Sequence, residues 1–168
     1  YQTSQTFEVP YTASDPPPGT GVASVQLWYR VGTSGPYIQY GTFTSAPISF
    51  TASSQGIYQF YTIATDNAGN VESAPLSPDA QTLVDRSPPT TLITLSGTLG
   101  GDGWYISEVK VTLTAADEGS GVGKTEYSFD GSSWTTYDGT LVLTNEGIRT
   151  LYYGSVDKAQ NVEQAKTE

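Results

Sequence analysis

Apolar and polar residues alternate over several short stretches of this chain, with the two-residue period of a β-strand that has one buried face. Clear examples are FEVPYTASD at Phe7–Asp15, VKVTLTAAD at Val109–Asp117 and QGIYQFYTIATDNAGN at Gln55–Asn70. Gly, Pro, Asn and Asp interrupt the alternation at short intervals, and no helical period is sustained. The pattern therefore predicts an all-β chain.

The pattern of strands occurs twice. Phe7–Asp15 matches Val109–Asp117, and each of these segments is followed by two further matching segments. The further pairs are Gly19–Arg30 with Gly119–Asp130, and Gln55–Asn70 with Glu146–Asn161. The last pair carries the motif Asp-x-Ala-x-Asn-Val-Glu in both copies, which indicates an internal duplication.

Several short alternating strands in each copy are typical of an antiparallel sandwich with one buried face per sheet. We expect two tandem immunoglobulin-like β-sandwiches, residues 1–86 and residues 87–168. The segment LVDRSPPTT at Leu83–Thr91 separates them, and its prolines favour a short, semi-rigid linker. The second copy opens with an extra strand, TLITLSG at Thr91–Gly97. We expect the matching first strand of the first copy to be truncated.

The second copy resembles a known family through a set of short motifs. These are PPTTLITLSG, GWYIS, VTLTA, GSGV, EYSFDG and DKAQNVE, which together span nearly all of Pro88–Glu168. They are similar to the immunoglobulin-like repeats of large secreted and cell-surface proteins of bacteria and archaea, which are akin to fibronectin type III modules. The first copy is less similar, since Pro10 and the run Asp15–Pro18 depart from the pattern. The resemblance implies an extracellular or cell-surface spacer, stalk or adhesive unit, with flanking domains of the same chain as its neighbours.

Composition narrows the possible functions. The chain has no Cys, Met or His, which removes thiolate nucleophiles, zinc sites of the usual kind and imidazole bases. Its net charge of −10 opposes binding to nucleic acid and to anionic membranes. No apolar run is long enough to span a membrane. We therefore expect a monomer that is not an enzyme and does not insert into membranes.

Two aspartates in each copy stand at strand ends that an immunoglobulin-like topology places at the same pole. They are Asp15 and Asp66 in the first copy, and Asp117 and Asp157 in the second. One interpretation is structural: Asp side chains accept hydrogen bonds from nearby backbone N–H groups and form Asx turns. In such a turn Gly69 would take a positive φ, although the second copy has Gln160 at the same place.

The other interpretation is calcium binding, since Ca²⁺ takes six to eight oxygen ligands from carboxylates, amides and carbonyls. In the second copy the candidate ligands are Asp117 and Asp157 with Asn161, joined by Asp85 from the linker side. The corresponding ligands in the first copy are Asp15, Asp66 and Asn70. Calcium is the one cofactor that the sequence suggests.

Aromatic residues offer a second possible site. The chain has 12 Tyr, 5 Phe and 3 Trp, and most of those on alternating strand positions are expected in the cores. Trp28, Tyr37 and Tyr40 are candidates for a flat platform that stacks on sugar rings. The expected function is thus a structural spacer or adhesion unit, and the alternative is a carbohydrate-binding accessory module of a secreted polysaccharide-degrading enzyme. A surface glycan or a protein docked on an exposed edge strand is the expected further partner.

Overall fold

The computed structural model describes all residues from Tyr1 to Glu168. The chain divides into two compact units, Tyr1–Arg86 and Ser87–Glu168, and each is described by itself. Apart from one 3₁₀ turn at Gly101–Gly103, the regular structure consists of β-strands. None of its helical structure has the length and apolar character needed to cross a membrane.

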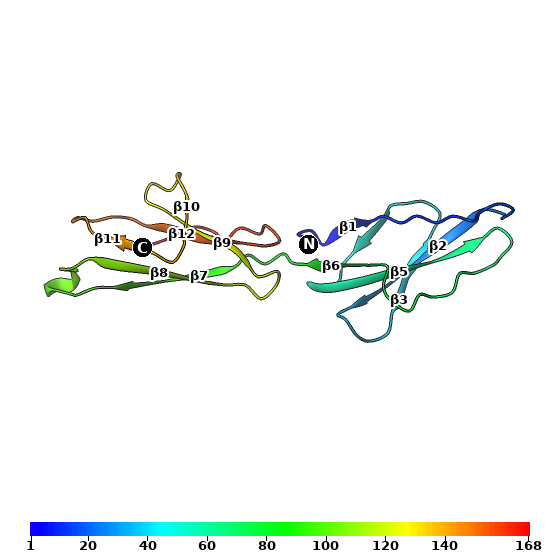
Figure 1. Ribbon diagram of the computed structural model, residues 1–168, viewed down its shortest axis with the longest axis horizontal. Coiled ribbons are helices and arrows are strands. Elements are labelled where there is room, and N and C mark those ends of the chain that lie inside the picture. Colours follow the sequence, from blue (N-terminus) through cyan, green and yellow to red (C-terminus); the bar gives the residue numbers. More distant parts are fainter. The chain divides into compact units, whose positions relative to one another are not determined.

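The first unit is built from two antiparallel sheets (Figure 1). The larger sheet has the order β3-β2-β5-β6, and the smaller one pairs β1 with β4. The strands are β1 (Thr6–Val9), β2 (Val22–Val31), β3 (Ile38–Phe43), β4 (Ile48–Thr51), β5 (Gly56–Asp66) and β6 (Ala80–Val84).

The second unit repeats this arrangement with one strand more. Its four-stranded sheet has the order β10-β9-β12-β13, and its smaller sheet has the order β11-β8-β7. The strands are β7 (Thr90–Ser96), β8 (Val109–Ala116), β9 (Val122–Ser128), β10 (Thr135–Thr136), β11 (Leu141–Leu143), β12 (Tyr152–Asp157) and β13 (Lys166–Thr167). The predicted all-β, antiparallel, immunoglobulin-like sandwich is confirmed.

Each unit has its own hydrophobic core. In the first unit Phe50, Tyr58 and Leu27 are fully buried, and Phe50 contacts Phe60 edge-on with ring centroids 4.9 Å apart. In the second unit the core is smaller and more aliphatic; it contains Val111, Leu113, Leu141, Leu151 and Tyr153. Burying each such side chain contributes about 1.5–3 kcal/mol, so each unit carries the means to fold around its own core.

One predicted strand is shorter than its pattern indicates. Alternation runs through Phe7–Asp15, yet β1 ends at Val9. The matching strand β8 continues to Ala116 because β7 pairs with it along its whole length. No strand of the first unit takes the place of β7, and Pro10 has no N–H to donate. The stretch Pro10–Asp15 therefore runs without a strand partner.

Candidate functional site: an acidic groove in the first unit

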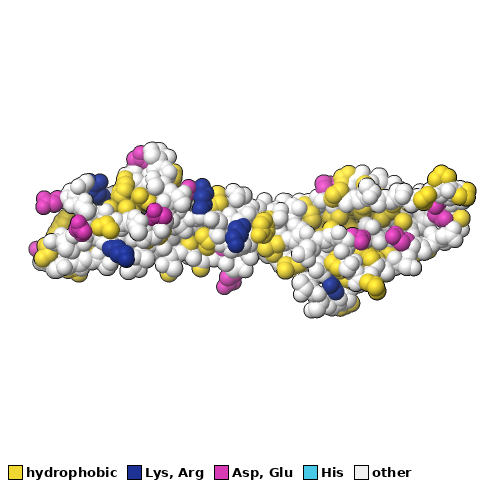
Figure 2. Space-filling model, in the orientation of Figure 1, with side chains coloured by type: hydrophobic (Ala, Val, Ile, Leu, Met, Phe, Trp, Pro, Cys, Tyr) yellow, Lys and Arg dark blue, Asp and Glu magenta, His cyan; other side chains and the backbone are white.

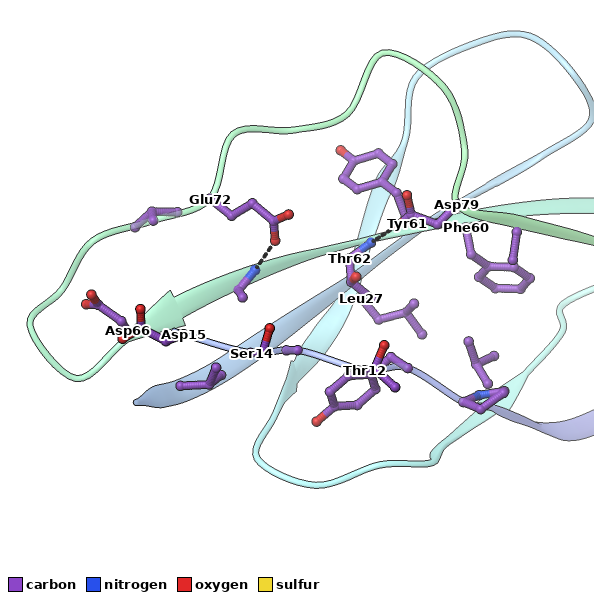
Figure 3. A pocket seen from close by; sticks show the side chains of 18 of the residues that line it. Thr12, Ser14, Asp15, Leu27, Phe60, Tyr61, Thr62, Asp66, Glu72 and Asp79 are labelled. Carbon is purple, nitrogen blue, oxygen red and sulfur yellow. Dashed lines mark hydrogen bonds between the residues drawn. The ribbon is translucent and has the colours of Figure 1, made fainter. Parts of the chain in front are cut away.

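A groove of about 800 Å³ lies between the unpaired stretch Pro10–Asp15 and strand β5. Figure 3 shows Thr12, Ser14 and Asp15 along one side of the hollow and β5 along the other. Glu72, from the chain after β5, overhangs it and points back toward that strand. Leu27 and Phe60 lie beneath the groove, and both belong to the buried core of the first unit.

The groove is acidic. Its lining includes four carboxylates and no Lys or Arg. Two of them bond to the backbone of β5: Glu72 Oε2 accepts from the N–H of Ala64 at 3.0 Å, and Asp79 Oδ2 accepts from the N–H of Thr62 at 3.0 Å. Figure 2 shows hydrophobic side chains of the first unit gathered between acidic ones. The groove thus places four carboxylates beside the buried core of the first unit.

The two predicted aspartates of the first unit, Asp15 and Asp66, both line one end of the groove. Asp66 Oδ1 accepts from the N–H groups of Ala68 and Asn70 at 2.9 and 2.8 Å, and its Oδ2 accepts from Asn70 Nδ2 at 2.7 Å. Asp15 Oδ2 accepts from the N–H of Gly21 at 2.9 Å. The bonds from Asn70 hold the pKa of Asp66 below its ordinary value of 3.8. Asp66 thus binds its own loop with the spacing of an Asx turn, and Asp15 binds the backbone six residues on.

The second unit brings its predicted pair together in the same way. Carboxylate oxygens of Asp117 and Asp157 lie within 4.8 Å of each other. Asp157 Oδ1 accepts from the N–H of Asn161 at 2.7 Å and its Oδ2 accepts from Asn161 Nδ2 at 2.6 Å. Asp117 Oδ2 accepts from the N–H of Gly121 at 2.6 Å and from that of Gly119 at 3.1 Å. The predicted turn role is therefore present in both units.

The third predicted calcium ligand, Asp85, lies at the end of the first unit, and its N–H donates to the carbonyl of Gln2 at 2.9 Å. Calcium binding by Asp85, Asp117, Asp157 and Asn161, or by Asp15, Asp66 and Asn70, stays a prediction. Two neighbouring carboxylates supply only part of the six to eight oxygens that Ca²⁺ takes.

The backbone of the two matching turns is alike. Gly69 has a φ of 88° and Gln160 has a φ of 75°, so both residues are in the left-handed region. Glycine adopts this conformation freely, whereas a residue with a Cβ is strained by about 1–2 kcal/mol. Gln160 in the second unit therefore adopts this conformation at the cost of backbone strain.

The predicted sugar-binding aromatics divide between two places. Trp28 stacks on Tyr61 with ring centroids 6.0 Å apart, and Tyr37 contacts the same ring at 4.5 Å. Tyr40 instead packs on Phe50 at 4.6 Å, at the border of the core. The hydroxyl of Tyr37 is buried and has no hydrogen-bond partner. Trp28 and Tyr37 therefore belong to one cluster around Tyr61, and Tyr40 lies outside it.

The sequence pattern did not predict three residues of these sites: Glu72 and Asp79 of the groove, and Tyr61 of the aromatic cluster. Glu72 had a signal, because it closes the repeated Asp-x-Ala-x-Asn-Val-Glu motif. Tyr61 lies opposite Trp28 in the β2–β5 pairing. That pairing cannot be read from the sequence alone, so the sequence did not indicate Tyr61. Asp79 lies in a loop that the second unit does not repeat, so the internal duplication did not indicate that Asp79 belongs to a site.

Comparison with known proteins adds little to this description. No family model and no curated protein matches the chain. The solved structure described as "Structures of Clostridium thermocellum CbhA fibronectin(III)-like modules" is similar to 99% of this chain and 85% of its own, with a TM-score of 0.46 and 16% sequence identity. The assignment of each unit as an immunoglobulin-like sandwich follows from the strand order given above.

Proposed function

We propose that the chain is a non-catalytic tandem module of a larger extracellular or cell-surface protein, where it acts as a structural spacer or adhesion unit. The observation that carries the proposal is the duplication of one sandwich topology, each copy with its own core. Self-contained modules in series keep their folds under load because neither needs the other's core to fold.

The chemistry of the groove supports a non-catalytic role. A general acid in glycoside hydrolysis needs a raised pKa. The pKa of Asp66 is instead lowered by hydrogen bonds from Asn70. Glu72 and Asp79 use an oxygen each to hold the backbone of β5. These carboxylates thus serve the fold.

Stretching single molecules of the chain between two handles tests the spacer role. We expect two separate unfolding events, one for Tyr1–Arg86 and one for Ser87–Glu168. At about 3.4 Å per residue each event releases roughly 280 Å of extended chain, less the folded length. A single event that releases the whole chain, or extension at low force without any event, contradicts the proposal.

The second candidate function is carbohydrate binding, which is favoured by the partly exposed Trp28 stacked on Tyr61. Passage over insoluble polysaccharides separates the two candidates. The spacer role predicts that the chain is not retained. Retention that is lost in Trp28→Ala but kept in Trp134→Ala, a partly exposed tryptophan of the other unit, establishes the carbohydrate-binding role instead.

A further inference from the structure

The larger sheet of the first unit has an outward face with a single charged side chain. Val25 and Leu27 of β2 are buried, so the alternation of a strand places Gln26, Trp28 and Arg30 on the opposite face. The pairings of β2 with β3 and β5, and of β5 with β6, add only uncharged residues to that face. Its one charge is thus a cation, although the unit has six acidic residues and two basic ones.

The second unit carries acids at the same positions of its own sheet. The sequence repeat aligns Gly19–Arg30 with Gly119–Asp130, so the three matching residues are Glu126, Ser128 and Asp130. Two carboxylates and a hydroxyl therefore stand where the first unit has an amide, an indole and a guanidinium. Because both units form the same sandwich, the shared fold does not require the indole or the guanidinium.

Arg30 is held in place without a carboxylate partner. Its Nε donates to Gln59 Oε1 at 2.8 Å, and Gln59 Nε2 in turn donates to Gln81 Oε1 at 3.0 Å. Its Nη1 donates to the carbonyl oxygen of Gly35 at 3.3 Å, and its guanidinium carbon lies 4.6 Å from the ring centre of Tyr37. A guanidinium has five N–H groups in a planar fork, so the Nη2 pair is left to donate to an added acceptor.

Trp28 supplies a flat apolar surface beside Arg30. The two residues are two positions apart on one face of β2, about 6.7 Å along the strand. Trp28 stacks on Tyr61 with an interplanar angle of 12°, and its Nε1 donates to Gln26 Oε1 at 3.1 Å. Tyr61 is only 9% exposed, whereas Trp28 is partly exposed, so Trp28 is the ring of this pair that offers more surface to a ligand.

A fixed aromatic ring beside an oriented guanidinium matches one class of sugar. The C–H face of a sugar ring packs on an aromatic ring, and the carboxylate of a uronic acid accepts paired hydrogen bonds from an arginine. The exposed amides of Gln39 and Gln81 lie on the same face, and an amide both donates and accepts, as sugar hydroxyls require.

We propose that this outward face binds a carboxylated polysaccharide, with a uronic acid ring on Trp28 and its carboxylate on Arg30. The inference rests on the carbohydrate-binding candidate function and names its ligand class. An acidic peptide is the poorer match, because its carboxylates make no use of Trp28. The acidic residues elsewhere in the unit weigh little at physiological salt, where exposed charges more than about 8 Å apart are largely screened.

Isothermal titration calorimetry of the full chain with polygalacturonate and with alginate tests the proposal, at about 0.15 M salt. A chelator in the buffer removes Ca²⁺ as a bridge between polymer and aspartates. Saturable binding of at least one polymer is expected. Its methyl-esterified form, which keeps the sugars and loses the carboxylates, is expected to bind at least about tenfold more weakly. Absence of binding to both polymers overturns the proposal.

Matched substitutions locate the contact. Arg30→Gln is expected to weaken binding of the polyuronate about tenfold or more, because it removes the charged donor. Arg86→Gln, which makes the same charge change at an exposed position of the same unit, is expected to leave the affinity unchanged. Thermal unfolding verifies that each variant is folded. Equal affinity of the parent chain and folded Arg30→Gln overturns the proposal.

The remaining outcomes separate this inference from the function on which it rests. Equal binding of the charged and esterified polymers that Trp28→Ala abolishes keeps the carbohydrate-binding function and overturns the carboxylate assignment. Polyglutamate that binds as tightly as the polyuronate, with no effect of Trp28→Ala, assigns the face to an acidic peptide and also overturns it. Failure to bind any polysaccharide, the insoluble ones included, refutes the candidate function as well.

Discussion

Single aspartates fix the loops of both sandwiches. Asp66 and Asp157 stand at the ends of matching strands, and each binds an Asn four residues on through both its carboxylate oxygens. The sequence predicts this role because Asp at a strand end before a turn accepts N–H groups from the loop. It does not distinguish the role from calcium binding, since both use the same oxygens.

Replacement of the second of these aspartates tests its structural role. Asp157→Ala removes the carboxylate that accepts from the N–H and from the side-chain amide of Asn161. We expect the second unit to lose about 1–3 kcal/mol of unfolding free energy, measured by urea denaturation. Glu118→Ala, at an exposed position, serves as the control and is expected to change stability little. Equal stability of Asp157→Ala and the parent chain contradicts the turn assignment.

Acid should lower the free energy of unfolding, because it protonates aspartates whose carboxylates accept hydrogen bonds within turns. Hydrogen bonds from Asn70 lower the pKa of Asp66, and those from the N–H groups of Ser133 and Ser132 lower the pKa of Asp130, both from an ordinary 3.8. A pKa that is lower in the folded state stabilises the fold above the unfolded value, and this contribution is lost as pH falls through the folded value.

Unfolding free energy should therefore decline as pH drops below about 4, and Asp130→Asn should flatten the decline. Urea midpoints collected across the acid range measure both effects. An unchanged slope in Asp130→Asn shows that this carboxylate is not held in its ionised form by the turn.

At the scale of strands, neighbours decide which predicted segments become strands. Alternation predicts strands at both Phe7–Asp15 and Val109–Asp117, yet only the second extends over nearly its whole predicted length. The pattern reports that one face of a segment is suited to burial. It does not report whether another strand lies alongside, and Pro10 further removes a donor. The groove could not be predicted for this reason, although its Glu72 lies in a motif visible in the sequence.

The two matching glutamates should differ in their effect on stability. Glu163→Gln weakens the buried bonds to Thr91 and the ion pair with Lys166 at 2.7 Å. We expect the second unit to lose about 1–3 kcal/mol. Glu72→Gln in the first unit should change stability by less than about 0.5 kcal/mol, since the residue is exposed. Thermal unfolding of both variants measures the contrast, and equal losses refute the assigned difference in burial.

At the scale of the whole molecule, the chain consists of two units with one topology. The sequence repeat predicts the shared fold because both copies preserve the alternating strands and the turn motif, which are the features that define a sandwich. It does not specify function, since the predicted calcium ligands and aromatic platform use residue types that folds also employ structurally. Trp28 and Tyr40 illustrate this: one stacks on Tyr61 and the other packs on Phe50.

The calcium prediction is tested on the whole chain by thermal unfolding with excess Ca²⁺ and with a chelator. Because Asp117 and Asp157 already accept backbone N–H groups, we expect the two melting temperatures to agree. A bound ion at a hundred times its Kd would add about 2.7 kcal/mol. A higher melting temperature in Ca²⁺ that is lost in Asp117→Asn establishes a calcium site and contradicts the turn-only account.

The central claim is that strand pairing, and not the alternating pattern alone, separates the stretch Pro10–Asp15 from the matching part of β8, which pairs with β7. Hydrogen–deuterium exchange of the full chain measures this most directly. Amides of Tyr11–Ser14 should exchange at least on the order of a hundredfold faster than those of the matching stretch Leu113–Ala116, which pairs with β7. Equal protection of the two stretches would show that a strand partner covers both, and the account of an open groove would be wrong.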